Sequence, residues 1–171
     1  MLATPLIRPV TARDALAVAR VHVRAWQEGY RGLIDREYLD GLRAEDRAQR
    51  YTFGTDDPAA PTTFVAEIDG VVRGFATIGA GQDREREIGE LQALYVDPPV
   101  WGAGIGRRLI AHARRELHAR GFPEAVLWIL VGNERAERFY SLDGWRAEDV
   151  TKTEQLWGTT ITETRFRRAL P

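Results

Sequence analysis

The chain has no cysteine among its 171 residues, and it has almost no net charge. The absence of cysteine excludes disulfides, thiolate metal sites, iron–sulfur clusters and a cysteine nucleophile. Its 24 Lys and Arg side chains against 25 Asp and Glu give a net charge of −1. This balance argues against a dedicated binder of nucleic acid or of a membrane surface, so any partner must be recognised by local features of the chain.

Long apolar runs and targeting signals are also missing. The longest uninterrupted apolar run, Ala125–Val131, is far shorter than the about 20 residues that a membrane span requires. No basic segment followed by an apolar one marks a secretory signal, so we expect a cytoplasmic protein. The three histidines, His22, His112 and His118, show no metal-ligand spacing. We therefore expect no metal site and place all three histidines on the surface.

The composition is that of an ordinary globular protein, with 44% hydrophobic and 29% charged residues. It excludes disordered, collagen-like and coiled-coil chains. Since about 100 to 200 residues is the usual size of one domain, residues 1–171 are expected to form a single domain with its core over about 6–169.

Apolar periodicity and turn signals predict a mixed α/β fold. Asp69-Gly70 between two β-branched runs is a strong hairpin signal. Thr11 and Asp14 form a capping-box variant ahead of a helix that ends near Gly29 or Gly32, with Leu16, Ala19, Val23, Trp26 and Tyr30 along one face. The expected strands cover 6–10, 63–68, 71–78, 90–96, 125–131, 145–150 and 161–169, the last two flanking a polar loop with Trp157. Further helices are expected within 35–53, over 105–120 and over 133–142.

The most informative segment is the glycine-rich turn from Val100 to Arg107, between a strand and a helix. Such a turn lets several backbone N–H groups and the helix dipole face one anion, as at pyrophosphate sites. A dinucleotide fingerprint from Gly102 fails because its third glycine would fall on Arg107. A Walker A loop fails because no Gly-Lys-Ser/Thr follows at the required spacing.

The turn resembles the coenzyme A loop of the GNAT superfamily, the GCN5-related N-acetyltransferases, which reads Gln/Arg-x-x-Gly-x-Gly/Ala. Here Trp101 takes the place of the Gln or Arg, and Arg107 and Arg108 would supply the missing charge. The flanking segments follow the family's order and spacing: Glu90-Leu-Gln-Ala-Leu-Tyr-Val-Asp-Pro98 upstream and Asn133-x-x-Ala136-x-x-Phe139-Tyr140-x-x-x-Gly144-Trp145 downstream.

The resemblance implies a GNAT fold, a central and mostly antiparallel sheet of six to seven strands flanked by about four helices. The sheet would splay between its fourth and fifth strands, beside a bulge in the fourth, and the slot would hold acetyl-CoA as co-substrate. The cofactor-binding residues implied are Leu94, Tyr95, Val96, Trp101, Gly102, Ala103, Gly104, Ile105, Gly106, Arg107, Arg108, Asn133, Ala136, Phe139 and Tyr140.

The resemblance also implies catalytic roles. An aliphatic ammonium titrates near about 10.4 and must lose a proton before it attacks a thioester, so a base is needed. Glu90 matches the family's general base, acting directly or through water. Tyr140 matches its general acid, which would protonate the departing thiolate. An acceptor pocket would be built from Trp26, Tyr30, Tyr38 and Trp157, with Glu28, Asp35 and Glu154 as ammonium partners.

The expected function is acetyl-CoA-dependent N-acetylation by direct attack of a primary amine on a small molecule, a peptide N-terminus or a lysine. One alternative is an acetyl-CoA-binding sensor or interaction module of the same fold without turnover. Another is an O-acyl or longer-chain acyl transferase. Homodimers are common in the family, but no feature of this sequence specifies one.

Overall fold

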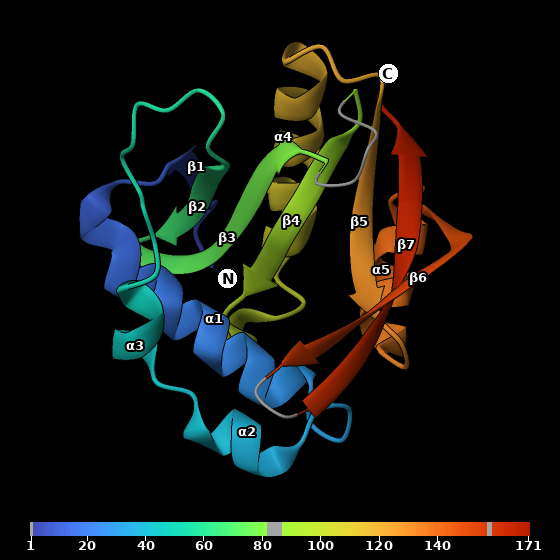
Figure 1. Cartoon of the computed structure of the whole chain (residues 1–171). Helices are drawn as coiled ribbons and strands as arrows, with labels where there is room; N and C mark the ends of the chain where they lie inside the picture. Colours follow the sequence, from blue (N-terminus) through green and yellow to red (C-terminus); the bar gives the residue numbers. More distant parts are fainter. Residues whose placement is uncertain (1, 82–86, 157–158) are drawn as a thin grey trace.

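Seven strands form one sheet in the order β1-β2-β3-β4-β5-β7-β6 in the computed structural model of the chain (Figure 1). The structure describes residues 2–81, 87–156 and 159–171. The strands are β1 Leu6–Pro9, β2 Thr62–Ile68, β3 Val71–Ala80, β4 Gly89–Val96, β5 Glu124–Leu130, β6 Arg146–Leu156 and β7 Thr159–Ala169. The helices are α1 Ala15–Gly29, α2 Arg36–Gly41, α3 Ala44–Ala48, α4 Ile105–Ala119 and α5 Glu134–Leu142, with 3₁₀ turns at Ala12–Asp14 and Pro98–Val100.

The structure confirms the predicted mixed α/β fold and differs from the expectation mainly at the C-terminal hairpin. The polar loop predicted after residue 150 is instead the second half of β6, which pairs with β7. Polar side chains line this half: Thr153 lies 3.2 Å from Thr162, and Gln155 donates to Thr160 over 2.6 Å. A strand without apolar alternation gives no periodic signal, which is why the sequence pattern missed it. The described residues form five α-helices, whereas about four were expected.

The first helix begins as predicted and buries a wider face than expected, which includes the predicted Ala19 and Val23. The Thr11 N–H donates to Asp14 Oδ2 over 2.7 Å, which closes the capping box. The buried face runs through Val18 and His22, whereas Leu16 is exposed. His22 is only 7% exposed, so its expected place on the surface was wrong. The helical spacing of four residues between Val18 and His22 explains the burial, since both then lie on the face toward the sheet.

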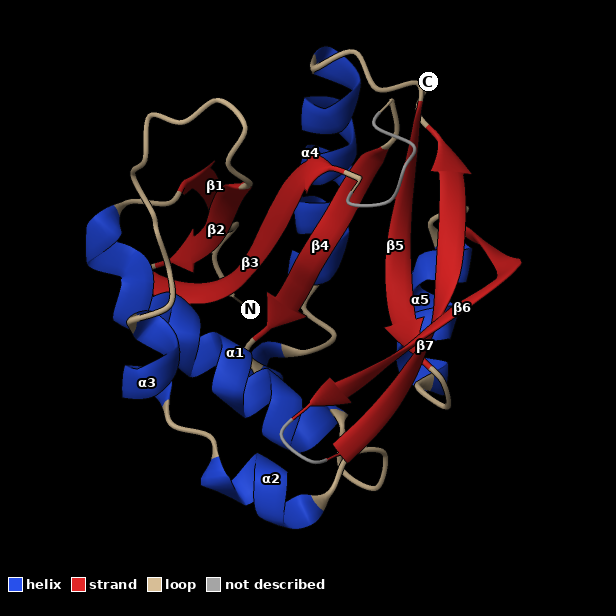
Figure 2. Cartoon of the chain, in the orientation of Figure 1, coloured by secondary structure: helices blue, strands red, loops and turns tan. Residues whose placement is uncertain are grey.

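Helices cover both faces of the sheet (Figure 2). On one face, Ile105, Leu109 and Leu117 of α4 pack in a core that also contains Trp145. On the other face, Val18 and Val21 of α1 pack against Phe75 of β3. Since α4 and α1 lie on opposite faces, β3 and β4 are held between them.

The sheet splits between β4 and β5. These two strands are parallel and pair only at Gly89 with Ala125 and at Glu90 with Val126, after which they diverge (Figure 1). The β3–β4 register shifts between Leu91 and Ala93, which leaves Gln92 in a bulge. The predicted splay and bulge are therefore present, and the facing edges of β4 and β5 are left without a strand partner.

A buried carboxylate anchors the end of β4. Asp97 is 1% exposed. It accepts a hydrogen bond from Arg24 Nε of α1 over 2.8 Å and from Arg73 of β3 over 3.0 Å. The strand that forms one wall of the split is thus tied to its neighbouring strand and to α1.

No helix in the described part of the chain is long and apolar enough to cross a membrane.

Candidate active site in the split of the sheet

A cavity of about 430 Å³ occupies the split. Residues 91–96 of β4 and 127–130 of β5 form its two walls, and residues from the 100–107 turn, α5 and the end of α1 complete it. Its volume lies in the usual range of small-molecule sites. The walls are the parts of β4 and β5 beyond their last paired residues, so backbone N–H and C=O groups face the cavity in place of a neighbouring strand.

The glycine-rich turn opens α4 at one end of this cavity. Gly104 is the N-cap of α4 with φ +83°, a conformation that is costly for other residues. The first backbone hydrogen bond of the helix runs from the Arg108 N–H to the Gly104 carbonyl. The N–H groups of residues 105–107 therefore have no partner within the helix and are free for an anion. Close packing favours glycine at position 106 as well, because a Cβ there would lie 3.3 Å from the ring of Phe139.

Most of the predicted cofactor-binding residues line the cavity, and two do not. Ala103 donates its N–H to the Val100 carbonyl inside the turn, and Arg108 is exposed on α4 away from the lining. Asn133 Oδ1 caps α5 by accepting from the Ala136 N–H over 3.1 Å. The predicted residues that line the cavity are Leu94, Tyr95, Val96, Trp101, Gly102, Gly104, Ile105, Gly106, Arg107, Asn133, Ala136, Phe139 and Tyr140.

A charged residue that sequence reasoning missed lies at Trp101. The guanidinium carbon of Arg135, on α5, lies 3.3 Å from the centre of the Trp101 ring, as in a stacked cation–π pair. The Trp101 Nε1–H donates to the Val96 carbonyl over 2.7 Å, which fixes the ring against the end of β4. Both residues line the cavity. Arg135 thus brings a positive charge to the position where Trp101 has none.

Tyr140 stands on α5 in the wall of the cavity. Its ring packs edge-on against Phe139, with centroids 5.0 Å apart, and it is half-buried. Burial raises the pKa of Tyr140 above its ordinary value, and the nearby Tyr95 and Asp143 act in the same direction. The phenol therefore keeps its proton at neutral pH and is able to donate it.

Glu90 lies at the closed end of the split, where β4 and β5 still pair, and the cavity lining begins one residue later. It is 7% exposed. Directly opposing residues of antiparallel strands point to the same face, so Glu90 shares the face of its partner Gly79. A Cβ on Gly79 would lie 2.8 Å from Gln92 Nε2, so the Gln92 amide lies on the same face as Glu90. This is the face that carries α1, because Gln92 lines a cavity together with His22 of α1.

Three of the four predicted acceptor residues, Trp26, Tyr30 and Tyr38, lie in the described part of the chain. Tyr30 lines the split, and its hydroxyl lies 3.4 Å from that of Tyr95. Burial raises the pKa of Tyr30 well above its usual range. Tyr30 also packs with Trp26 and Tyr38 on a small core that contains Ile34 and Leu39. The ring centroids of Trp26 and Tyr30 lie 4.9 Å apart. The fourth residue, Trp157, lies outside the described residues.

The split sheet, the glycine-rich helix start and the flanking helices define the GNAT class of acyl-CoA-dependent transferases. Residues 22–145 match the Acetyltransferase (GNAT) family, and the chain belongs to this family as an acetyltransferase.

Individual relatives agree with this assignment. The chain is 34% identical over 122 residues to an uncharacterized N-acetyltransferase of Archaeoglobus fulgidus, covering 70% of this chain and 80% of that protein. A GCN5-related N-acetyltransferase structure from Rhodopseudomonas palustris aligns with TM-score 0.78 and 22% identity over 99% of this chain and 98% of that one. The yncA structure from Salmonella typhimurium, solved with its cofactor acetyl-CoA, aligns with TM-score 0.73 and 21% identity over 99% and 95%. At these identities the two structures establish the fold alone.

Proposed function

We propose that this chain transfers the acetyl group of acetyl-CoA directly to a primary amine, with the thioester held in the split between β4 and β5. The observation that carries the proposal is the split itself, whose walls present unpaired backbone groups and end at the free N–H groups of α4. None of the described residues that line this cavity is acidic, and Arg107 and Arg135 are basic. Such a lining suits a polyanionic coenzyme.

The backbone of β4 and the α4 turn would hold the co-substrate. The N–H and C=O groups of Leu94 and the N–H of Val96 would bond the pantetheine amides as an added strand does. The backbone groups of Tyr95, between them, face β3, as does the Asp97 N–H, which donates to the Arg73 carbonyl. A wall N–H would stabilise the negative charge that develops on the thioester oxygen. The 105–107 N–H groups and Arg135 would bind the phosphates. When bound, acetyl-CoA supplies an activated acetyl group, and coenzyme A leaves as the thiol while the amine becomes an amide.

Two side chains would move the protons. Glu90 would take the proton of the ammonium through a water beside Gln92, since both side chains lie on the face that carries α1. Tyr140 would give its proton to the departing sulfur, because it lines the split and stays protonated. The absence of cysteine is consistent with direct transfer, without a cysteinyl intermediate.

The test measures coenzyme A release and product mass over a panel of amines. We expect wild-type turnover with acetyl-CoA and a fall in kcat of about 100-fold in Tyr140→Phe, in the range typical of a lost general acid, with unchanged acetyl-CoA affinity. Glu90→Gln is expected to lower kcat/KM. It should also remove the low-pH limb of the kcat/KM profile, on which protonation of the Glu90 carboxylate would limit the rate. Acetyl-CoA binding without turnover of any amine would instead support a non-catalytic binding module, and turnover unchanged in Tyr140→Phe would remove its role as acid.

A further inference from the structure

A second cavity, of about 410 Å³, lies on the face of the sheet that carries α1. Its walls come from α1, from α3 and the segment after it, and from β2, β3 and β4. Gln92 and Ala93, at the bulge of β4, line both this cavity and the split. We call it the bulge cavity. A molecule in it would reach the split at the bulge, on the face that Glu90 shares.

Unpaired polar atoms gather at the bulge cavity. In the described part of the chain, six buried side-chain nitrogen or oxygen atoms have no hydrogen-bond partner. Three of them, His22 Nδ1, Arg47 Nε and Tyr51 OH, belong to residues that line this cavity. A fourth, Trp26 Nε1, belongs to a ring stacked on His22 with centroids 5.1 Å apart.

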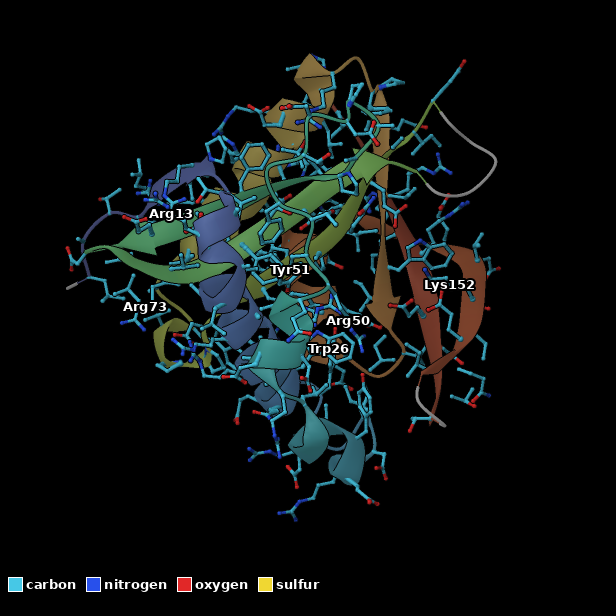
Figure 3. The ribbon with its side chains drawn as sticks, turned by 60° about the vertical axis from the view of Figure 1, so that its left-hand side comes forward. Arg13, Trp26, Arg50, Tyr51, Arg73 and Lys152 are labelled. Atoms are coloured by element: carbon cyan, nitrogen blue, oxygen red, sulfur yellow. The ribbon has the colours of Figure 1, made fainter. Side chains whose placement is uncertain are left out.

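Buried polar atoms without partners are rare and costly in folded proteins. Their concentration beside one cavity makes it a candidate ligand site, at which Arg47 also lies over the Tyr51 ring, 5.4 Å from its centre. Arg50 and Tyr51, which both line the cavity, are labelled in Figure 3 together with Trp26 of α1.

The charge of the bulge cavity is positive. Arg47 and Arg50 line it, and none of its described lining residues is acidic. Burial, together with the charge of Arg47, lowers the pKa of His22 to about 3, so its imidazole is neutral at physiological pH. The cavity therefore offers the Arg47 guanidinium and the Tyr51 phenol to a ligand, a pair that fits an anionic oxygen group.

The rest of the wall is apolar and aromatic. The rings of Tyr51 and Phe53 stack with centroids 4.5 Å apart, and Phe75 lines the same cavity. Such walls suit a flat or apolar molecular body. The volume of about 410 Å³ is that of a small-molecule site.

We propose that the bulge cavity is the acceptor subsite and that it takes small primary amines carrying a carboxylate or phosphate group. The anionic group binds at Arg47 and Tyr51, and the amine end reaches the split beside Gln92 and Ala93. This assignment rests on the proposed acetyl transfer. It differs from the expected pocket around Trp26, Tyr30, Tyr38 and Trp157, of which the first three pack on one small core.

The first experiment compares amines that differ only in the anionic group. The pairs are 4-(aminomethyl)benzoate with 4-(aminomethyl)benzamide, β-alanine with β-alaninamide, and O-phosphoethanolamine with ethanolamine. In at least one pair kcat/KM is expected to be tenfold or more higher for the anionic member, as a charge-assisted hydrogen bond would give. The pair that responds distinguishes carboxylate from phosphate. Values within threefold in every pair would overturn the proposal.

Variants then locate the effect. Arg47→Gln is expected to abolish the preference for the anionic amine while leaving acetyl-CoA affinity unchanged. Arg36→Gln is the matched control, since that arginine is exposed on α2 and removes the same charge. If Arg47→Gln fails to fold, Tyr51→Phe removes only one hydroxyl from the same wall and should raise the KM of the anionic amine at least threefold. A preference that survives both substitutions contradicts the site.

A binding measurement separates this proposal from the proposed function. Calorimetric titration with 4-methylbenzoate, which has no amine to acetylate, should show saturable binding to the wild type and at least tenfold weaker binding to Arg47→Gln. The neutral 4-methylbenzamide should bind no better to the wild type than to the variant. Acetyl transfer to amines without any such anion binding would refute only the role of the bulge cavity as acceptor subsite. Failure to bind acetyl-CoA would instead refute the proposed function.

Discussion

At the scale of single residues, Trp101 and Arg135 form a stacked pair at the loop position where the family's motif has one Gln or Arg. Trp101 takes the position of a Gln or Arg and is fixed to the Val96 carbonyl, and Arg135 stacks on its ring from α5. The sequence did not predict this pair because the two residues lie on different elements and meet only through the fold. The charge was expected from Arg107 and Arg108, and of these only Arg107 lines the cavity.

Replacing Arg135 should therefore weaken coenzyme binding. We expect Arg135→Gln to raise the Kd for acetyl-CoA about three- to tenfold, since one charge-assisted contact to a phosphate is lost. Arg138→Gln, an exposed neighbour on the same helix, is the control and should bind as the wild type does. Calorimetry at two salt concentrations provides the measurement, and equal affinities for the two variants would exclude a contact from Arg135.

At the scale of elements, β4 carries the site because its two edges differ. One edge pairs with β3 through a bulge, and the other is open from Leu91 onward. Asp97 then fixes the strand end through Arg24 and Arg73. The strand is held rigidly on one side while its other edge stays available, which suits a binding edge.

Removing the anchor should cost stability. We expect Asp97→Ala to lower the free energy of unfolding by roughly 2 to 4 kcal/mol, because two arginines lose a buried partner but are themselves partly exposed and able to turn to water. Asp40→Ala removes the exposed partner of Arg36 and should cost less than about 0.5 kcal/mol. Urea unfolding of both variants tests this, and similar losses would show that Asp97 is no anchor.

The elements also show how far the sequence reached. Strands and helices with an apolar face, such as β2, β3 and α4, were predicted closely because burial imposes a period on the sequence. The second half of β6 was missed because its side chains are polar. Most residues of the two motif segments and the glycine-rich turn line the split, and the sequence could single them out because their spacing along the chain is local. The sequence did not single out Arg47 and His22, which line the bulge cavity, because only tertiary packing brings α1 and α3 together beside β3.

At the scale of the whole molecule, the buried His22 makes stability depend on pH. Burial lowers its pKa to about 3, whereas an unfolded chain has a histidine pKa near about 6.5. Between these values the unfolded chain binds a proton that the folded chain does not. The stabilisation is therefore complete above pH 6.5 and is lost as the pH falls toward 3, by up to about 1.4 kcal/mol per pH unit.

Unfolding in urea at several pH values between 7.5 and 4.5 measures this slope. We expect His22→Gln to show a shallower loss of stability with falling pH than the wild type, whatever its stability at pH 7.5. His118→Gln, an exposed histidine, should keep the wild-type slope. The experiment needs a buffer without carboxylate or phosphate, because such an anion, bound in the bulge cavity as proposed, would itself stabilise the folded protein. An unchanged slope in His22→Gln would assign the acid sensitivity to other groups.

The split of the sheet also bears on how the protein behaves at high concentration. The edge of β4 beyond Glu90 is a row of backbone groups without a neighbouring strand, the kind of edge through which proteins associate into aggregates. A coenzyme bound along that edge, as we propose, would cover it and so prevent association with other copies of the protein. The supply of co-substrate would then govern the solubility and storage life of the enzyme as well as its rate.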